Sequence, residues 1–257
     1  MDTPRPLSVA IITKDEEERL PACLQGLGFA AEVLVVDSDS KDRTVDVARS
    51  FGARVLVEEW RGFSGQKQFA VDSCSHDWVL ILDADERVPP ETASLIAREM
   101  RAQDPETAAY SFMRRNYFHG RWIRHCGWWP DRIVRLVDRR RGRFDGEPVH
   151  ERWITEGKIK WLDTAIEHES FRNYSQMVMK MEAYSNLTSL ALFRRNVKTR
   201  AFAPVSHGVW MFVKSYVLEL GLLDGFDGFF ISMTNAGGSF LKYAKLREHR
   251  RAGQGGL

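Results

Sequence analysis

The sequence of 257 residues is long enough for one large domain, or for one domain with an elaborated end. Its content of 44% hydrophobic and 28% charged residues is typical of a folded protein and excludes a disordered chain. A net charge of +2 argues against a general polyanion binder. Cys23, Cys74 and Cys126 are widely spaced and form no CxxC pair, which fits structural thiols in a reducing compartment.

The first twenty residues contain too short an apolar run for the core of a signal peptide. No stretch reaches the roughly 18 consecutive apolar residues of a transmembrane helix. We therefore expect a cytoplasmic protein, a location that still allows it to lie on a membrane surface.

The first hundred residues alternate between two kinds of segment. Continuous apolar runs of strand length occupy 7–13, 31–37, 53–59 and 77–83. Between and after them, helical patterns occupy 16–27, 41–52, 64–74 and 90–102. Strands that are apolar throughout and separated by helices predict an α/β fold, with a mostly parallel sheet covered on both faces.

This alternation ends near residue 108. Two further strands are expected at 108–120 and 132–140, with loops rich in arginine and tryptophan between them. After residue 173 the pattern is helical, at 175–195, 206–223 and 226–249. We therefore predict one domain over 1–172, divided into halves at 1–107 and 108–172, followed by a helical extension over 173–257.

Polar side chains follow the predicted parallel strands at the points where they end. They are Thr13 and Glu16 after the first strand, Asp37 and Asp39 after the second, and Asp83 and Asp85 after the fourth. In an open parallel sheet, ligands bind outside these carboxyl ends, so we expect the groups to converge. Aspartate is also a common turn and capping residue, and for Asp39 alone that interpretation is preferred.

The segment "LDADE" places Asp83, Asp85 and Glu86 within four residues. Carboxylates this close repel one another unless a positive charge lies between them. A divalent cation meets that need, and Mg²⁺ typically takes one or two carboxylates together with substrate phosphates. Glu86 is either a supporting residue behind the metal ligands or a turn residue. No Walker A loop or GxGxxG motif follows the first strand, which disfavours P-loop and dinucleotide-binding proteins.

Four blocks of the sequence, in order, resemble the inverting glycosyltransferases of family 2, which have the GT-A fold. They are "VAIITKDEEERL", "VLVVDSDSKDRT", "GQKQFAVDSCSHDWVLILDADE" and "FDGEPVHE". Within that family the sequence most resembles bacterial lipopolysaccharide core β-glucosyltransferases, which share the "LDADE" and "VHE" blocks. The resemblance covers most of the chain and implies a Rossmann-like, nucleotide-sugar-binding half followed by an acceptor half.

The resemblance also implies roles for individual residues. Thr13, Glu16 and Asp37 are expected to hold the nucleoside of the donor, with Lys67 near the nucleotide. Asp83 and Asp85 correspond to the DxD pair, and Asp85 is expected to be the principal ligand of a divalent metal, Mg or Mn. Ser38 and Asp39 replace the Asp-Gly that is usual in the second block, which leaves the contact of Asp39 with the donor open.

The reaction implied is transfer of a hexose, expected to be glucose, from a UDP-sugar to a hydroxyl of a lipopolysaccharide core or a similar anionic glycan. Glu151 is the expected general base, and His150 is expected to orient it or to touch the acceptor. Charge and spacing alone would instead favour His150 and Glu151 as a pair of surface residues after a turn at Pro148.

Between Arg114 and Arg143 the chain has ten arginines and two acidic residues, interleaved with tryptophans. Arginine pairs with phosphate and carboxylate groups, and we expect the tryptophan faces to stack on sugar rings. The candidate acceptor residues are Arg132, Arg135, Trp128 and Trp129. Nothing here resembles an RNA-binding motif, so an anionic glycolipid is expected rather than nucleic acid.

An apolar stripe at helical spacing runs from Val209 to Leu223, and from Lys198 onward the chain has eight Lys/Arg against four Asp/Glu. This pattern fits a helix lying in a membrane interface, here the inner face of the bacterial inner membrane. It fits a packed core helix or a subunit interface equally well, and both alternatives stay open.

Two other function classes are retained. A sugar-nucleotide nucleotidyltransferase also combines a Rossmann-like half with acidic metal ligands, but it usually carries a glycine-rich basic loop after the first strand. A non-catalytic glycan- or lipid-binding protein is the other. Slow hydrolysis of a sugar nucleotide without acceptor would separate an enzyme from such a binding protein.

Overall fold

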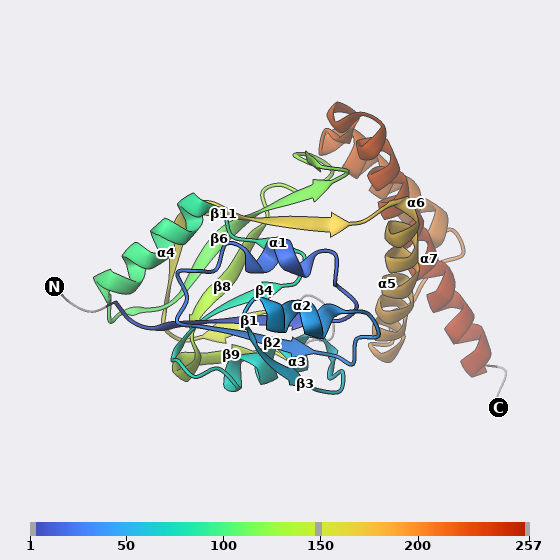
Figure 1. Ribbon diagram of the computed structural model, residues 1–257. Helices are drawn as coiled ribbons and strands as arrows, with labels where there is room; N and C mark the ends of the chain where they lie inside the picture. The colour runs from blue at the N-terminus through green and yellow to red at the C-terminus, as the bar shows by residue number, and fades with distance from the viewer. Residues whose placement is uncertain (1–3, 147–150, 255–257) are drawn as a thin grey trace. The chain divides into compact units, whose positions relative to one another are not determined.

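The computed structural model describes residues 4–146 and 151–254 of the chain (Figure 1). These residues form two compact units. The first unit comprises Met1–Arg115 and Asp131–His168, and the second comprises Asn116–Pro130 and Glu169–Leu257.

The first unit is built on a mixed sheet whose strands follow the order β3-β2-β1-β4-β8-β6-β11-β5. In chain order the strands are β1 (Leu7–Thr13), β2 (Glu32–Asp37), β3 (Arg54–Val57), β4 (Trp78–Asp83), β5 (Glu86–Arg87), β6 (Thr107–Phe118), β8 (Arg132–Asp138) and β11 (Lys158–Phe171). Strands β1 to β4 are parallel to one another, whereas β8 pairs antiparallel with both β4 and β6. The predicted α/β class, with a parallel half and a mixed half, is confirmed.

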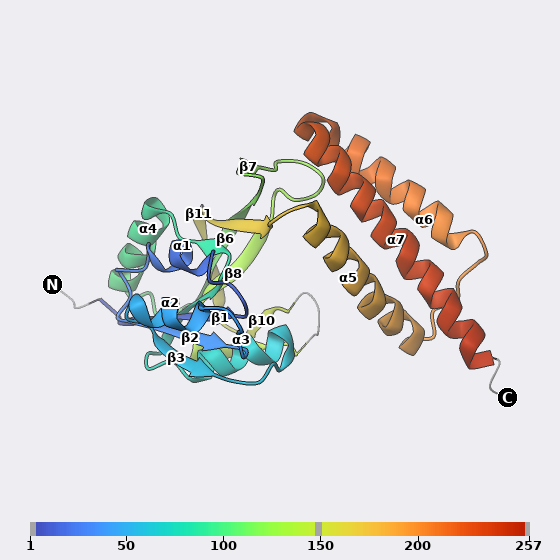
Figure 2. The same ribbon diagram turned by 45° about the vertical axis from the view of Figure 1, so that its right-hand side comes forward.

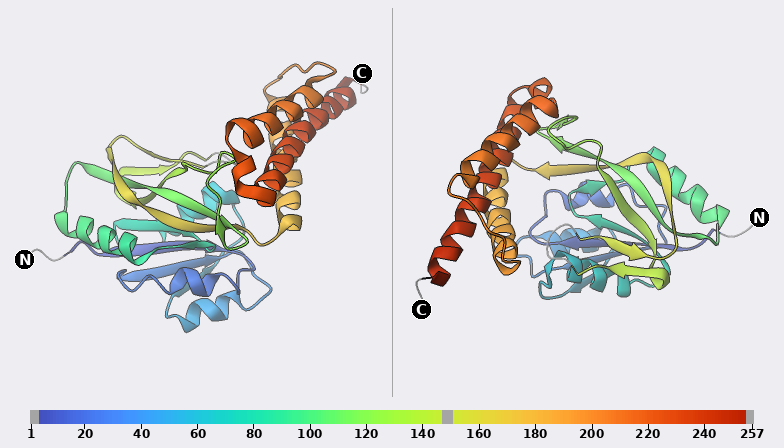
Figure 3. Two further views of the ribbon diagram at one scale, coloured as in Figure 1. Left: turned by 90° about the horizontal axis from the view of Figure 1, so that it is seen from above. Right: turned by 180° about the vertical axis from the view of Figure 1, so that it is seen from behind.

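Helices cover both faces of this sheet (Figures 1 and 3). They are α1 (Leu20–Leu24), α2 (Thr44–Ser50), α3 (Gly62–Asp72) and α4 (Pro90–Ala102). Alternate residues of each central strand enter different cores, because successive side chains of a strand point to opposite faces. Ile11 and Leu82 pack with α1, α2 and α4, and Ile12 and Ile81 pack with α3.

The core between the sheet and α3 is completed by a hairpin of two strands, β9 (Gly142–Phe144) and β10 (Trp153–Thr155). The hairpin follows the short 3-10 turn η1 (Arg139–Arg141). Phe144 and Trp153 pack edge to face, with ring centroids 5.4 Å apart. Burying an aromatic or aliphatic side chain of this size stabilises a fold by roughly 1.5–3 kcal/mol. The hairpin therefore fixes the position of β10, which begins two residues after Glu151.

Helix α1 is shorter than the predicted helix over 16–27, and a loop takes the place of its first turn. The backbone N–H of Glu16 donates to Thr44 Oγ1 at 2.8 Å, and that of Glu17 donates to Asp42 Oδ2 at 3.1 Å. In return, Lys41 N donates to Asp15 Oδ1 at 2.7 Å. Residues 15–17 are thus bound to the loop after β2, and Leu20 N donates to Glu16 O at 2.9 Å in a turn that leads into α1.

The second unit consists mainly of helices (Figure 2). They are α5 (Tyr174–Arg194), α6 (Ala203–Phe212), a π-helical segment η2 (Val213–Leu218), a 3-10 turn η3 (Gly221–Asp224) and α7 (Gly225–Gln254). Helix α7 lies between α5 and α6, and the short strand β7 (Arg121–Trp122) pairs with the end of β6. The predicted helix over 206–223 is interrupted after Phe212. Within the described parts of the chain, none of the helices is both long enough and apolar enough to span a bilayer.

Candidate active site

The parallel strands end side by side, and this places the predicted polar groups at one edge of the sheet. In the β1–β2 ladder Thr13 pairs with Asp37, and in the β1–β4 ladder Ile12 pairs with Asp83. Trp78 to Leu82 are buried, and Asp83 is the first partly exposed residue of β4. The convergence expected for these strand ends is therefore present.

Asp83 lies between two cations. Lys67 Nζ, on α3, is 2.9 Å from Asp83 Oδ1, and Arg135 Nη2, on β8, is 2.8 Å from Asp83 Oδ2. Burial by itself would raise the pKa of Asp83, but the positive charges of Lys67 and Arg135 outweigh burial and hold this pKa well below its ordinary value. Asp83 is thus a carboxylate at neutral pH.

Glu86 is fully buried beneath the acidic turn. Its Oε2 accepts the backbone N–H of Asp83 at 3.1 Å, and its Oε1 accepts from Arg135 Nη2 at 2.6 Å. Arg114 Nη1 lies 3.6 Å from the same Oε1. Burial lowers the pKa of Arg135, and the carboxylates of Glu86 and Asp83 more than restore it, so the net direction is upward. Glu86 therefore holds the turn in place from below, behind the two aspartates.

Asp85 faces a different pair of side chains. Arg19 Nη1 is 3.2 Å from Asp85 Oδ2, and His168 Nε2 is 3.5 Å from Asp85 Oδ1. His168 reaches this position because β11 pairs antiparallel with β5, which places His168 opposite Glu86. The guanidinium of Arg19 is buried, and its Nη2 has no hydrogen-bond partner in the described residues, which leaves a donor available for an anionic ligand.

This part of the site offers a divalent cation only a few protein ligands. Asp85 and His168 supply a carboxylate and an imidazole, both common ligands of divalent metals, whereas Asp83 is already neutralised by two cations. In the described ranges, no three His, Cys, Asp or Glu side chains are gathered into a preformed metal site. Mg²⁺ is usually bound by one or two carboxylates and completed by water and substrate phosphate oxygens, and Asp85 supplies such a carboxylate.

The predicted nucleoside residues lie at the ends of β1 and β2. Asp37 is buried and accepts the backbone N–H of Ser40 at 2.9 Å. Thr13 is also buried, and its hydroxyl has no hydrogen-bond partner in the described part of the chain. Asp39 is instead 71% exposed and pairs with Lys41 at 2.5 Å, which lowers the pKa of Asp39. Glu16 lies near Arg19, at 3.9 Å.

Glu151 comes to the same edge of the sheet from the segment before β10. Its Oε1 is 2.7 Å from Lys67 Nζ, and the Lys67 side chain is only 2% exposed. One lysine therefore contacts both the first aspartate of the acidic turn and the predicted base, which are separated by 68 positions in the sequence. His150 lies outside the described residues.

The four predicted acceptor residues are distributed over both units. Arg135 is buried against Asp83 and Glu86, as described above. Arg132 donates to Ser111 Oγ at 2.8 Å, and its guanidinium lies 4.7 Å from the centre of the Trp161 ring. In the second unit Trp128 packs on Phe171, and Trp129 packs on Trp122. Their role toward an acceptor stays a prediction.

Arg19, Arg114 and His168 are site residues that the sequence pattern did not indicate. Arg19 directly precedes α1 and lies in a charged run, where it resembles a solvated residue. His168 lies 83 positions after Asp85, and only the β5–β11 pairing places it beside that aspartate. Each depends on tertiary pairing rather than on a local motif.

Carboxylates gathered at the carboxyl ends of parallel strands are typical of α/β proteins that bind a ligand at that end of the sheet. Residues 8–155, more than half of the chain, match the sequence profile described as "Glycosyl transferase family 2". The chain belongs to glycosyl transferase family 2 and is a glycosyltransferase.

Similar proteins cover nearly the whole chain. The "Lipopolysaccharide core biosynthesis glycosyltransferase LpsC" of Rhizobium meliloti is 31% identical over 253 residues, covering 94% of this chain and 92% of that protein. An "Uncharacterized glycosyltransferase" of Rickettsia bellii is 32% identical over 253 residues, covering 94% of this chain and 86% of that protein.

Among solved structures, the mannosyltransferase PcManGT from Pyrobaculum calidifontis, in complex with GDP-Man and Mn²⁺, is 15% identical. Its TM-score is 0.49, with 98% of this chain and 80% of that chain covered. TarS 1–349 from S. aureus, in complex with UDP, is 14% identical with a TM-score of 0.46, covering 96% of this chain and 92% of that chain.

Proposed function

We propose that this glycosyltransferase moves a hexose, glucose in the first instance, from a UDP-sugar to a hydroxyl of a lipopolysaccharide core or a similar anionic glycan. The reaction would invert the configuration at the anomeric carbon of the sugar. The observation that carries the proposal is the contact of Lys67 with both Asp83 and Glu151, which sets a donor-side carboxylate beside a candidate base. The relative named for lipopolysaccharide core biosynthesis supports the choice of acceptor.

In this proposal the acceptor oxygen forms a bond to the anomeric carbon while the bond from that carbon to the diphosphate oxygen breaks. The hydroxyl proton passes to the Glu151 carboxylate. Lys67 contacts Glu151 Oε1, so we assign the proton to Oε2. His150, the preceding residue, is assigned to orient the base or to contact the acceptor.

Asp85, with His168 beside it, is the main residue that would hold a divalent cation, Mg or Mn, and Asp83, which is already paired with Lys67 and Arg135, would contribute less. When bound, such an ion neutralises charge that develops on the departing diphosphate. Arg19, which contacts Asp85 and has one unpartnered buried nitrogen among the described residues, would add a second positive group for the diphosphate. Thr13, Glu16 and Asp37 would bind the nucleoside.

Membership of family 2 favours sugar transfer over both nucleotidyl transfer and non-catalytic glycan binding. A glycolipid acceptor would also bring the enzyme to a membrane, and we propose that it acts on the inner face of the bacterial inner membrane.

The test is a panel of sugar nucleotides incubated with the full chain, Mn²⁺ and a truncated lipopolysaccharide core. Release of UDP from UDP-glucose, and a β-linked product identified by NMR, are the expected results. Release of pyrophosphate from a nucleoside triphosphate and a sugar phosphate would indicate nucleotidyl transfer instead. Binding of glycan with no turnover of any donor would contradict the enzymatic proposal.

A further inference from the structure

The second unit exposes many large apolar side chains from α6 to the middle of α7. They are Phe202, Val205, Val209, Trp210, Val217, Leu218, Leu220, Leu222, Leu223, Phe226, Phe229, Met233 and Phe240. Phe202, Val205 and Val209 are spaced by three and four residues, as are Phe226, Phe229 and Met233, so each set forms a stripe on one side of its helix.

This surface contains very little charge. Between residues 201 and 223 only Lys214 and Glu219 are charged at neutral pH, if His207 is neutral. Asp224 is buried in its contacts with His125 and Arg121 and adds no exposed negative charge. An exposed apolar surface of this extent marks an interaction site on a protein that is otherwise well packed.

The α6 stripe is not the face by which α6 packs on α7. Gly208 of α6 is buried against α7, where an added Cβ would lie 3.3 Å from Phe240 Cβ and 3.4 Å from Ala236 O. Phe202 and Val209, by contrast, are 80% and 59% exposed. The α6 stripe is therefore still uncovered after the helices of this unit have packed.

A strongly basic end adjoins this apolar surface. The segments 194–202 and 242–251 contain nine Lys/Arg and a single acidic residue, Glu248. They lie side by side, because Arg247 Nη1 donates to Arg200 O at 3.2 Å and Arg250 Nη2 donates to Asn196 Oδ1 at 3.0 Å. Both segments thus contribute positive charge to one end of the second unit.

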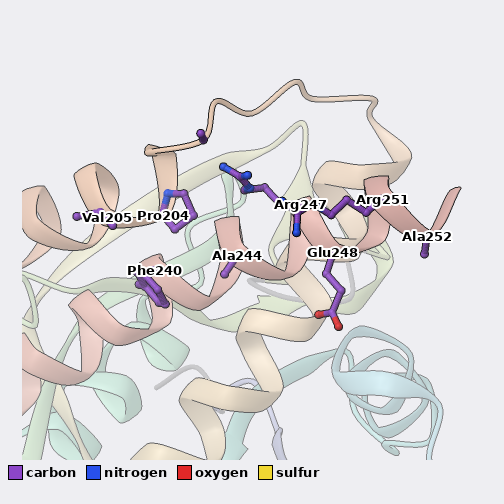
Figure 4. A pocket seen from close by; sticks show the side chains of 9 residues that line it. Pro204, Val205, Phe240, Ala244, Arg247, Glu248, Arg251 and Ala252 are labelled. Atoms are coloured by element: carbon purple, nitrogen blue, oxygen red, sulfur yellow. The ribbon is translucent and has the colours of Figure 1, made fainter. Parts of the chain in front are cut away.

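A cavity of about 630 Å³ lies where the basic end meets the start of α6 (Figure 4). Val205 of α6 and Phe240 of α7 form its apolar wall, and Arg247, Glu248 and Arg251 line the rest. Apolar side chains next to guanidinium groups match the two parts of an anionic lipid, its acyl chains and its phosphate.

We propose that the apolar surface of α6, η2, η3 and α7 docks onto a lipid bilayer that carries anionic headgroups, with the basic end facing the phosphates. The apolar stripes would enter the interface, and the described helices would lie on the bilayer without crossing it. Charge decides between a bilayer and a second copy of this chain as the occupant. Nine basic residues against one acidic residue beside the surface complement an anionic bilayer, whereas a second copy would bring the same positive charge.

Docking onto a bilayer extends the proposed function. Only the biological purpose of the docking rests on the proposed glycolipid acceptor. Binding to vesicles is measured without donor, acceptor or turnover. A protein that binds vesicles but transfers no sugar would contradict the proposed function alone, and an active protein that ignores vesicles would contradict this inference alone.

The experiment is co-sedimentation of the full-length protein with vesicles of phosphatidylglycerol and phosphatidylcholine, or of phosphatidylcholine only. The test variant is Phe202→Ser/Val209→Ser, and the matched control is Phe63→Ser/Val57→Ser, a Phe and a Val of the first unit that are 41% and 59% exposed. We expect the test variant to bind mixed vesicles at least about tenfold more weakly, and the control to bind like the wild type.

A second variant, Arg200→Gln/Arg251→Gln, removes positive charge and leaves every apolar side chain of the surface in place. It should lose binding to phosphatidylglycerol vesicles, and added salt should weaken the wild type in the same way. Thermal unfolding midpoints equal to that of the wild type would show that each variant is folded. Equal binding of the wild type and both variants would overturn the proposal. A dimer in sedimentation velocity that Phe202→Ser/Val209→Ser converts to monomer, without change in vesicle binding, would assign the surface to a second copy.

Discussion

Lys67 Nζ lies 2.7 Å from Glu151 Oε1 and 2.9 Å from Asp83 Oδ1, so a single buried ammonium joins the candidate base to the acidic turn. Two carboxylates brought to one site would repel each other, and the lysine between them removes that cost. The same contact fixes the position of Glu151 relative to the strand that presents the donor ligands. Lys67 is therefore a positioning residue for both groups.

Replacing Lys67 with methionine is predicted to destabilise the protein and to impair transfer. The substitution leaves Asp83 and Glu151 without their shared cation, and removal of one partner of a buried ion pair typically costs about 3–5 kcal/mol. Urea unfolding measures the change. In the control Lys158→Met, the lost partner Glu106 is 77% exposed, and the expected cost is under about 1 kcal/mol. Equal stability of the two variants would contradict the role of Lys67.

Glu86→Ala is predicted to destabilise the protein by about 3 kcal/mol or more, since it leaves the buried Arg135 with less compensation and removes the acceptor for Asp83 N–H. Glu91→Ala, at an exposed position in the first turn of α4, should cost about 1 kcal/mol or less. Chemical denaturation compares the two. If Glu86→Ala were as stable as the wild type, Glu86 would not support the turn.

The stability of the first unit should depend on pH through Glu32, at the start of β2. Burial alone would raise the pKa of Glu32, but hydrogen bonds from Ser8, Ser75 and Arg54 lower it from 4.5 to about 2. Because the folded-state pKa is depressed, the stabilisation is complete above about pH 4.5 and is lost as pH falls toward 2.

The variant Glu32→Gln should therefore be less stable than the wild type at pH 7, by up to about 3 kcal/mol. The difference should shrink steadily between pH 4.5 and pH 2. Urea unfolding at a series of pH values measures both quantities. A difference between the two proteins that stays constant over this range would show that Glu32 is not responsible.

Asp85→Asn is predicted to weaken Mn²⁺-dependent binding of UDP-glucose by at least about tenfold, because a neutral amide is a poorer ligand for a divalent cation than a carboxylate. Asp77→Asn is the control, since Asp77 lies before the opposite end of β4 and pairs with Arg140 at 2.9 Å. Calorimetry with and without Mn²⁺ gives the affinities. If Asp85→Asn bound UDP-glucose with unchanged dependence on Mn²⁺, Asp85 would not be a ligand of the metal.

The parallel half of the fold was predictable because its strands are continuous apolar runs bounded by helices. β1 has the predicted bounds, Leu7–Thr13, and so does α4, Pro90–Ala102. α1 is shorter than predicted, and the residues before it donate their backbone N–H groups to Thr44 and Asp42 of the loop after β2. Bonds between two loops that are distant in the sequence have no local signature.

The acidic turn was likewise predictable from three carboxylates that end a buried strand. Of the two cations that contact Asp83, Lys67 was expected near the nucleotide from the resemblance, whereas the position of Arg135 was not predicted. Arg135 lies in an arginine-rich stretch that predicts a surface for an anionic acceptor, yet antiparallel pairing of β8 with β4 places it beneath Asp83. The local sequence does not distinguish a buried arginine from an exposed one. The burial of Arg135 follows from the order of the strands in the sheet.

The role of Glu151 as the base is tested by the turnover of Glu151→Gln, measured together with its affinity for UDP-glucose. The amide retains the shape of the side chain and cannot accept the hydroxyl proton, so kcat should fall by about 10²–10⁴-fold. Donor affinity by calorimetry should change little, and Glu156→Gln, at an exposed position nearby, should have wild-type turnover. Wild-type kcat in Glu151→Gln would contradict the assignment of Glu151 as the base.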